Sequence, residues 1–165
     1  MNLYGSFQMT QIFLISDTHF GHSNIIQYCN RPFKDSEEMD ESLISMWNKT
    51  VNKDDKVYHL GDVGFKSFAK LKLIFDRLNG TKVLIKGNHD GFKLSQYSQL
   101  FKDVRGSHQL AGYLLTHIPI HPDSLSRWKG NIHGHVHDKS LSDKRYINVS
   151  VENINYTPIA LDLLL

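Results

Sequence analysis

The sequence predicts an α/β fold in which two packed β-sheets are flanked by helices. In the first hundred residues, short apolar runs that suit buried strands alternate with helical patterns. From about Lys102 onward, strand-like stretches follow one another with few helical patterns between them. We therefore expect a second, largely antiparallel sheet packed against the first.

Three continuous apolar runs have the pattern of central strands that are covered on both faces. They are residues 12–15, 57–60 and 82–85. The strand-like stretches expected in the second sheet are Val104 and residues 109–110, 113–115, 131–132, 146–149 and 159–161.

Two amphipathic helices are expected between these first strands. The first should begin near Asp35, because Glu38 three residues later would complete a capping box. The second carries apolar residues at helical spacing from Phe68 to Leu78, and Asn79 and Gly80 provide its stop signal. Both apolar stripes are interpreted as core.

The chain has 165 residues, enough for one domain and one sizeable core, so residues 1–165 are treated as a single domain. Met9 could be the start of the compact fold, which would make residues 1–8 an N-terminal extension. The sequence leaves that choice open.

Composition excludes several classes of function. The formal charge is only +2, so no strong basic field favours nucleic acid or anionic lipid. Cys29 is the only cysteine, which excludes an intramolecular disulfide and a thiolate metal cage. No apolar run approaches the ~18 residues of a membrane span, and the N-terminus lacks the pattern of a signal peptide. A cytoplasmic protein with no membrane partner is expected.

Polar residues gather in five short clusters, each directly after an apolar run. Loops beyond the carboxyl ends of strands converge on one crevice in layered α/β folds, so these clusters can meet. Their carboxylate, amide and imidazole donors suit Mn²⁺, Fe or Zn²⁺ at a non-structural site. The clusters are Asp17-Thr18-His19, Gly61-Asp62, Gly87-Asn88-His89-Asp90, Thr116-His117 and Gly134-His135-Val136-His137.

The order of these clusters resembles the calcineurin-like metallophosphoesterase superfamily, in particular its small single-domain bacterial or phage-type members. The resemblance runs from about Ile12 to His137. One such motif alone occurs by chance, whereas five in a fixed order form a specific signal. The resemblance implies a four-layer α/β/β/α sandwich built on two mixed sheets.

The resemblance also implies a centre of two divalent ions, with Mn, Fe, Zn and Ni as candidates. The ligands of the first ion would be Asp17, His19, Asp62 and His137. Asp62 would bridge to a second ion, whose other ligands would be Asn88, His117 and His135. A shared anionic oxygen reduces the repulsion between two cations ~3.5–4 Å apart.

The implied reaction is hydrolysis of a phosphodiester or phosphomonoester by a metal-bridging hydroxide. His89 would protonate the leaving group, and Asp90 would orient the His89 ring through a hydrogen bond. His22 and Arg31 are candidates for substrate binding, since an arginine makes a good bidentate phosphate clamp. An arginine beside a proline and a histidine so close to His19 also suit structural roles.

Two features depart from the family pattern. Many members have a second acid three residues after the aspartate of the Gly-Asp motif, where this chain has Phe65. The interval from Asp17 to Asp62 is also long, and we expect it to form one wall of the substrate crevice.

An enzyme is the leading interpretation, and its substrate would be a small phosphate ester. A diester of nucleotide type is favoured on resemblance alone, and a nuclease is weaker because the charge is near balance. The alternative is a catalytically silent scaffold or binding subunit with the same fold. Such a protein should have lost ligands or its proton donor, and this chain retains all seven candidate ligands and His89. Its oligomeric state is not determined by the sequence.

Overall fold

The three apolar runs form the centre of a five-stranded sheet in the computed structural model, which describes residues 10–165. Strands β1 (Ile12–Ile15), β2 (Lys56–His59) and β3 (Thr81–Ile85) pair in parallel, as continuous apolar strands covered on both faces do. The suggested extension, residues 1–8, lies outside the described residues.

Two strands at the edges of this sheet were expected in the second sheet. β4 (Asp103–Arg105) pairs in parallel with β3, and β9 (Ile159–Ala160) pairs antiparallel with β1, which gives the order β4-β3-β2-β1-β9. The prediction was wrong for both. β4 follows the short helix α4 (Leu94–Tyr97) and so continues the alternation of strand and helix, while β9 returns to the free edge of β1.

The second sheet has four strands in the order β5-β6-β7-β8. Only β5 and β6 pair antiparallel; β6–β7 and β7–β8 are parallel, so the expectation of a largely antiparallel sheet was wrong. Residues 116–129 and 134–145 are long enough for the crossovers that parallel neighbours need. Both sheets are therefore mixed, as the family resemblance implied. The strands are His108–Leu110, Tyr113–Leu115, Gly130–His133 and Tyr146–Asn148.

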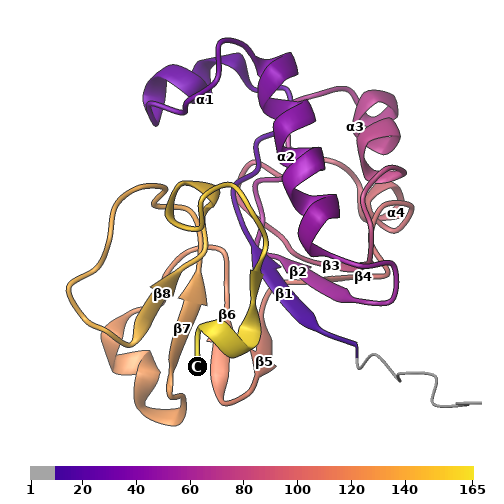
Figure 1. The fold of residues 1–165 in the computed structure, drawn as a ribbon. Coiled ribbons are helices and arrows are strands. Elements are labelled where there is room, and N and C mark those ends of the chain that lie inside the picture. The colour runs from indigo at the N-terminus through magenta and orange to yellow at the C-terminus, as the bar shows by residue number, and fades with distance from the viewer. Residues whose placement is uncertain (1–9) are drawn as a thin grey trace, which may run out of the picture.

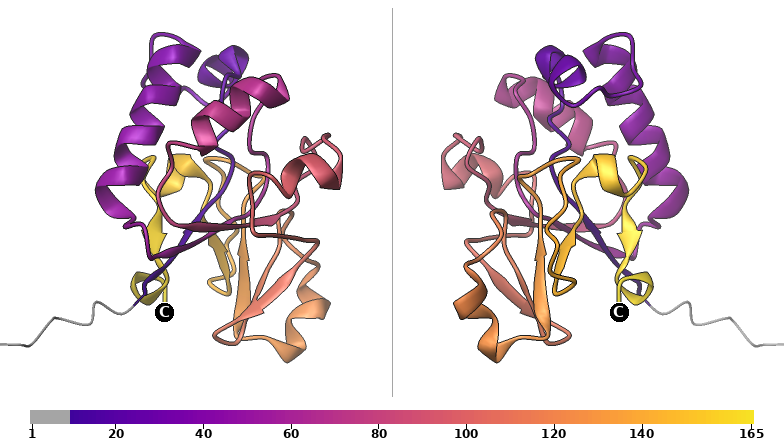
Figure 2. Two further views of the ribbon diagram at one scale, coloured as in Figure 1. Left: turned by 90° about the vertical axis from the view of Figure 1, so that its right-hand side faces the viewer. Right: turned by 90° about the vertical axis from the view of Figure 1, so that its left-hand side faces the viewer.

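Helices cover the face of the first sheet that points away from the second (Figure 1). The side views show the same layering (Figure 2). After β6 the described residues form only 3-10 helices, of which η1 lies between β6 and β7 in the chain. The helices are α1 (Ser23–Tyr28), α2 (Ser36–Thr50), α3 (Phe68–Phe75), α4, η1 (Pro122–Arg127), η2 (Val151–Asn153) and η3 (Leu161–Leu163). No helix within residues 10–165 is long and apolar enough to cross a membrane.

The predicted cap of α2 is present with one change. The Asp35 carboxylate accepts a hydrogen bond from the Glu38 N–H at 2.8 Å. The Glu38 carboxylate accepts from the Lys34 N–H at 2.7 Å, one residue earlier than in a capping box. The helix therefore begins at Ser36, next to the predicted position.

Alternate residues of β1 face two different cores. Phe13 and Ile15 pack with the helices, whereas Leu14 packs with Leu115 and Ile132 of the second sheet. Successive side chains of a strand point to opposite faces, so one face of β1 packs against the second sheet and the other face packs against the helices. The parallel pairing of β1, β2 and β3 places the carboxyl ends of these strands at a common edge.

We expect Leu14→Ala to lower the free energy of unfolding by about 2–5 kcal/mol, because the side chain is fully buried between the sheets. Leu73→Ala is the matched control, since Leu73 is 67% exposed on α3, and should change it by less than about 0.5 kcal/mol. Urea denaturation in the presence of a chelator measures both. Equal effects of the two substitutions would contradict the proposed packing.

Candidate metal centre

The loops that follow the central strands have an unusual backbone. Asp17, His19, Asp62, His135 and His137 have φ values of 59°, 51°, 55°, 72° and 52°. Residues with a Cβ rarely adopt this left-handed region. Such strain persists where surrounding contacts enforce it, and it concentrates at functional sites. The five residues are all candidate ligands from the sequence.

One group of donor atoms comes from loops of both sheets. Ligand atoms of Asp17, His19 and His137 lie within 4.8 Å of one another. The Asp17 Oδ1 atom is 3.8 Å from His19 Nε2 and 3.9 Å from His137 Nε2. These three side chains could hold one ion.

A second group consists of Asp62, His117 and His135, whose ligand atoms also lie within 4.8 Å of one another. The His117 Nδ1–H donates to the Leu60 carbonyl at 2.7 Å, so its Nε2 atom faces the group. Asn88 Oδ1 lies 2.8 Å from that Nε2 atom. The structure therefore brings all seven predicted ligands together in two adjoining sets.

The Asp62 carboxylate lies between the two sets. Its Oδ2 atom is 3.7 Å from His19 Nε2 and 3.4 Å from His117 Nε2. Its Oδ1 atom accepts a hydrogen bond from the His89 backbone N–H at 2.9 Å. One oxygen is thus fixed by the protein and the other faces both sets, which is the geometry a bridging ligand requires.

The donor chemistry fits a divalent cation. Asp17 Oδ1 and His19 Nε2 are buried and have no hydrogen-bond partner among the described residues. Buried polar atoms nearly always have a partner. Ligand atoms about 2.0–2.2 Å from one ion lie about 3–3.5 Å from each other, close to the separations found here.

Both carboxylates are held in the charged form. Burial raises the pKa of Asp17, but the nearby His19 and His117 and a hydrogen bond from the His135 N–H outweigh burial, so this pKa lies well below its ordinary value. Burial likewise raises the pKa of Asp62, and the contact with His117 brings it below its usual range. The two sets therefore share two negative charges.

Asp90 does not orient the His89 ring, contrary to the sequence-based prediction. Its buried carboxylate accepts hydrogen bonds from three backbone N–H groups, those of Asp62 and Val63 at 3.0 Å and of Gly87 at 2.7 Å. Adjacent side chains diverge in this turn, so Asp90 points inward while His89 is exposed. Asp90 instead fixes the loop that carries the bridging candidate.

Arg31 was a candidate for substrate binding, and its position contradicts that role. Its side chain is fully buried. It donates to the backbone carbonyls of Asp17 and Thr18 at 2.8 and 3.0 Å, and twice to Glu152 Oε1, at 2.9 and 2.7 Å. Its donors are occupied inside the protein, so Arg31 supports the loop after β1.

Glu152 is a site residue that the sequence analysis missed. Its Oε1 atom accepts from His137 Nδ1–H at 3.1 Å as well as from Arg31. This contact leaves Nε2 of His137 directed toward Asp17. Glu152 follows the last strand of the second sheet and belongs to no short motif, so one sequence gives no signal for it.

His59 is a fully buried histidine whose two ring nitrogens are both hydrogen-bonded. Burial lowers its pKa to about 3, so the ring is neutral. Its Nδ1 atom accepts from the Gly61 N–H at 3.2 Å, which leaves the proton on Nε2 to donate to Thr18 Oγ1 at 2.9 Å. Thr18 Oγ1 in turn donates to the Val63 carbonyl at 2.8 Å. The loops after β1 and β2 are tied together in this way.

His22 lies at the edge of a pocket of about 510 Å³ that opens over the site. Its ring stacks on Phe65 at 4.1 Å, and its Nδ1 atom is 3.4 Å from His19 Nδ1. The structure leaves a role of His22 in substrate binding as a prediction. The interval between Asp17 and Asp62 does form a wall of this pocket, through residues of α1 and the next position along the chain: Ile25, Tyr28 and Cys29.

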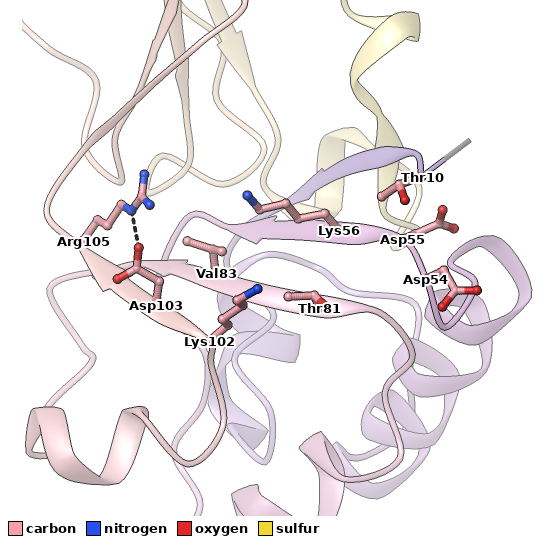
Figure 3. Close-up of a pocket in the computed structure, with 9 residues that line it drawn as sticks. All are labelled: Thr10, Asp54, Asp55, Lys56, Thr81, Val83, Lys102, Asp103 and Arg105. Carbon is pink, nitrogen blue, oxygen red and sulfur yellow. Dashed lines mark hydrogen bonds and ion pairs between the residues drawn. The ribbon is translucent and has the colours of Figure 1, made fainter. Parts of the chain in front are cut away.

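A second pocket, of about 340 Å³, extends from the amino ends of β2 and β3 to β4 (Figure 3). Its charged side chains are partly paired with one another or with backbone. Asp103 accepts from Arg105 at 2.6 Å, and Asp55 accepts from the backbone N–H groups of Gln11 and Asn52. None of the candidate ligands lines it, so it is separate from the candidate metal centre.

Known proteins resemble the chain along nearly its whole length. The uncharacterized protein MJ1445 of Methanocaldococcus jannaschii is 42% identical over 167 residues, which cover 94% of this chain and 90% of that protein. The gene 66 protein of Mycobacterium phage L5 is 31% identical over 183 residues, 87% of each chain. The crystal structure of AQ665 from Aquifex aeolicus, a protein of unknown function, has a TM-score of 0.75 at 27% identity and covers 95% of this chain and 100% of that chain.

The model of the calcineurin-like phosphoesterase family matches residues 10–161. This range contains every candidate ligand, both sheets and the supporting pair of Arg31 and Glu152. The family resemblance and the fold class predicted from the sequence are thereby confirmed. The chain belongs to the calcineurin-like phosphoesterase family.

Proposed function

We propose that the protein hydrolyses a phosphodiester or phosphomonoester at a centre of two divalent metal ions. The observation that carries this proposal is the position of Asp62 Oδ2, which faces His19 on one side and His117 on the other. A mononuclear site would have no use for a carboxylate oxygen shared between two donor sets. Membership of the family supports metal-dependent phosphoester hydrolysis in general.

Two sets of side chains would hold the ions. When bound, a pair of divalent ions supplies an activated water as nucleophile and positive charge that stabilises the phosphoryl group. The oxygen and imidazole donors suit Mn, Fe, Zn or Ni. The first set is Asp17, His19, Asp62 and His137, and the second is Asp62, Asn88, His117 and His135.

His89 is our candidate for the group that protonates the leaving group. It belongs to neither donor set, it is exposed, and its side chain lines the pocket over the site. Its ring centroid is 6.0 Å from that of His19, and its backbone N–H is fixed on Asp62. A proton held on the His89 ring could thus reach an ester oxygen of a phosphate seated in the pocket.

The scaffold alternative has little support in the site. A binding subunit has no need for buried, strained donor sets, and strained backbone costs of order 1–3 kcal/mol at each residue. Five candidate ligands carry this strain. We therefore favour the enzyme.

His89→Ala should lower kcat for bis(p-nitrophenyl) phosphate with Mn²⁺, because general acid catalysis contributes ~10²–10⁴-fold. The variant should retain both metal ions. A leaving group as good as nitrophenolate places the effect at the lower end. Turnover and metal content by plasma mass spectrometry are the measurements. His121→Ala is the control, since that side chain is 73% exposed and lies outside the pocket.

Loss of metal together with activity in His89→Ala would identify His89 as a ligand. Absence of turnover with each of Mn, Ni, Fe, Co and Zn, in wild-type protein that demonstrably binds the metal, would refute the proposed hydrolysis and favour the scaffold.

Glu152→Gln should weaken metal binding by about 10–100-fold, because a carboxylate that orients a ligand histidine makes the ring more basic and fixes its direction. Titration calorimetry with Mn²⁺ measures the affinity. Glu41→Gln is the matched control, since it removes an exposed acid that pairs with Arg77 and belongs to neither donor set. An unchanged affinity in Glu152→Gln, with the fold intact by circular dichroism, would show that Glu152 has no part in metal binding.

A further inference from the structure

We propose that the pocket over the metal centre accepts a nucleobase on an aromatic wall, so that the substrate is a nucleoside phosphate. This inference rests on the proposed function, because it assumes that the phosphate lies at the two donor sets. The aromatic wall consists of His89, Phe65, His22 and Tyr28. His22 and Tyr28 line the pocket, and Phe65 lies against His22.

The wall is a continuous series of rings that starts at the metal centre. Phe65 lies 5.2 Å from His89 and stacks on His22 at 4.1 Å. His22 is followed by Tyr28, 6.4 Å away in an edge-to-face arrangement. The exposed Tyr28 ring at the end of this series offers a surface on which another aromatic ring can stack.

Two rings of the wall are exposed to an extent that core packing does not explain. Tyr28 is 72% exposed and Phe65 is 45% exposed. Exposed apolar surface next to a pocket commonly marks a binding site. The only fully buried residue of α1 is Ile25, so this short helix contributes little to the core and presents Tyr28 at the rim.

The rest of the pocket wall suits a ligand with an apolar face and polar edges. Ile25, Cys29 and Val136 contribute apolar surface, while Asp138 and Lys139 supply an acceptor and a donor. The pocket volume of about 510 Å³ is in the range for small-molecule sites. A phosphate carrying only a sugar would leave the apolar side uncovered.

The position of Tyr28 distinguishes a nucleoside phosphate from an aryl phosphate. The His22 ring is 5.4 Å from that of the candidate ligand His19, and Tyr28 lies beyond His22. A ring esterified directly to phosphorus would stay near His19 and His22. A base separated from its phosphate by a pentose can reach Tyr28.

The test compares the binding of AMP, ribose 5-phosphate and phenyl phosphate to the Mn²⁺-loaded protein by titration calorimetry. AMP should bind about 5- to 100-fold more tightly than ribose 5-phosphate, the range that one stacked base contributes. Tyr28→Ala should abolish most of this preference, and Tyr28→Phe should retain it. Leu73→Ala, an exposed apolar side chain outside the pocket, should leave it unchanged.

Equal affinity for AMP and ribose 5-phosphate, or a preference that survives Tyr28→Ala, would overturn the inference. Phenyl phosphate binding as tightly as AMP would also overturn it, since the ring would then stack at His22 without a sugar spacer. Hydrolysis of bis(p-nitrophenyl) phosphate is measured in parallel. If the protein hydrolyses this diester but binds AMP no more tightly than ribose 5-phosphate, only the inference about the aromatic wall is refuted. If it does not hydrolyse the diester, the proposed function itself is refuted.

Discussion

The buried carboxylate of Asp17 is the group around which the site is organised. Its Oδ2 atom accepts from the His135 N–H at 2.9 Å and from Ser150 Oγ at 3.0 Å, while Oδ1 faces His19 and His137. A desolvated charge is costly unless donors or cations surround it, so the loops of both sheets must close around this carboxylate. Space is equally limited: a Cβ on Gly134 would collide with the carboxylate, which leaves glycine as the residue that fits.

A second layer of buried polar groups enforces the strained loops. Arg31 fixes the carbonyls of Asp17 and Thr18, and it balances the charge of Glu152. Asp90 performs the corresponding task for the loop of Asp62, by accepting from three backbone N–H groups. The left-handed conformations at the donor residues persist because these contacts are buried, where a lost hydrogen bond costs about 1–3 kcal/mol.

The sequence predicts the parts of this arrangement that are local and misses those that depend on distant pairing. Residues 12–15 are predicted as a central strand because burial on both faces leaves a continuous apolar run, and the donor clusters are predicted because they directly follow such runs. The contact between Arg31 and Glu152 joins positions 121 residues apart. Many arginines and acidic residues in one sequence could pair, so the sequence does not show that these two do. Asp90 was misassigned since sequence adjacency to His89 does not show that the two side chains point in opposite directions.

The two sides of the pocket are built in different ways. The metal-facing side is held by buried charges and by backbone contacts between loops of both sheets, so a change there disturbs several strands at once. The opposite side comes from α1 and the residue that follows it, where the Tyr28 side chain is 72% exposed. Tyr28 contacts His22 and neither donor set, so a substitution at Tyr28 can alter this side of the pocket without removing a contact of the donors. A rigid set of buried donors therefore lies beside a more exposed wall, the arrangement in which a wall residue can change while the donors keep their geometry.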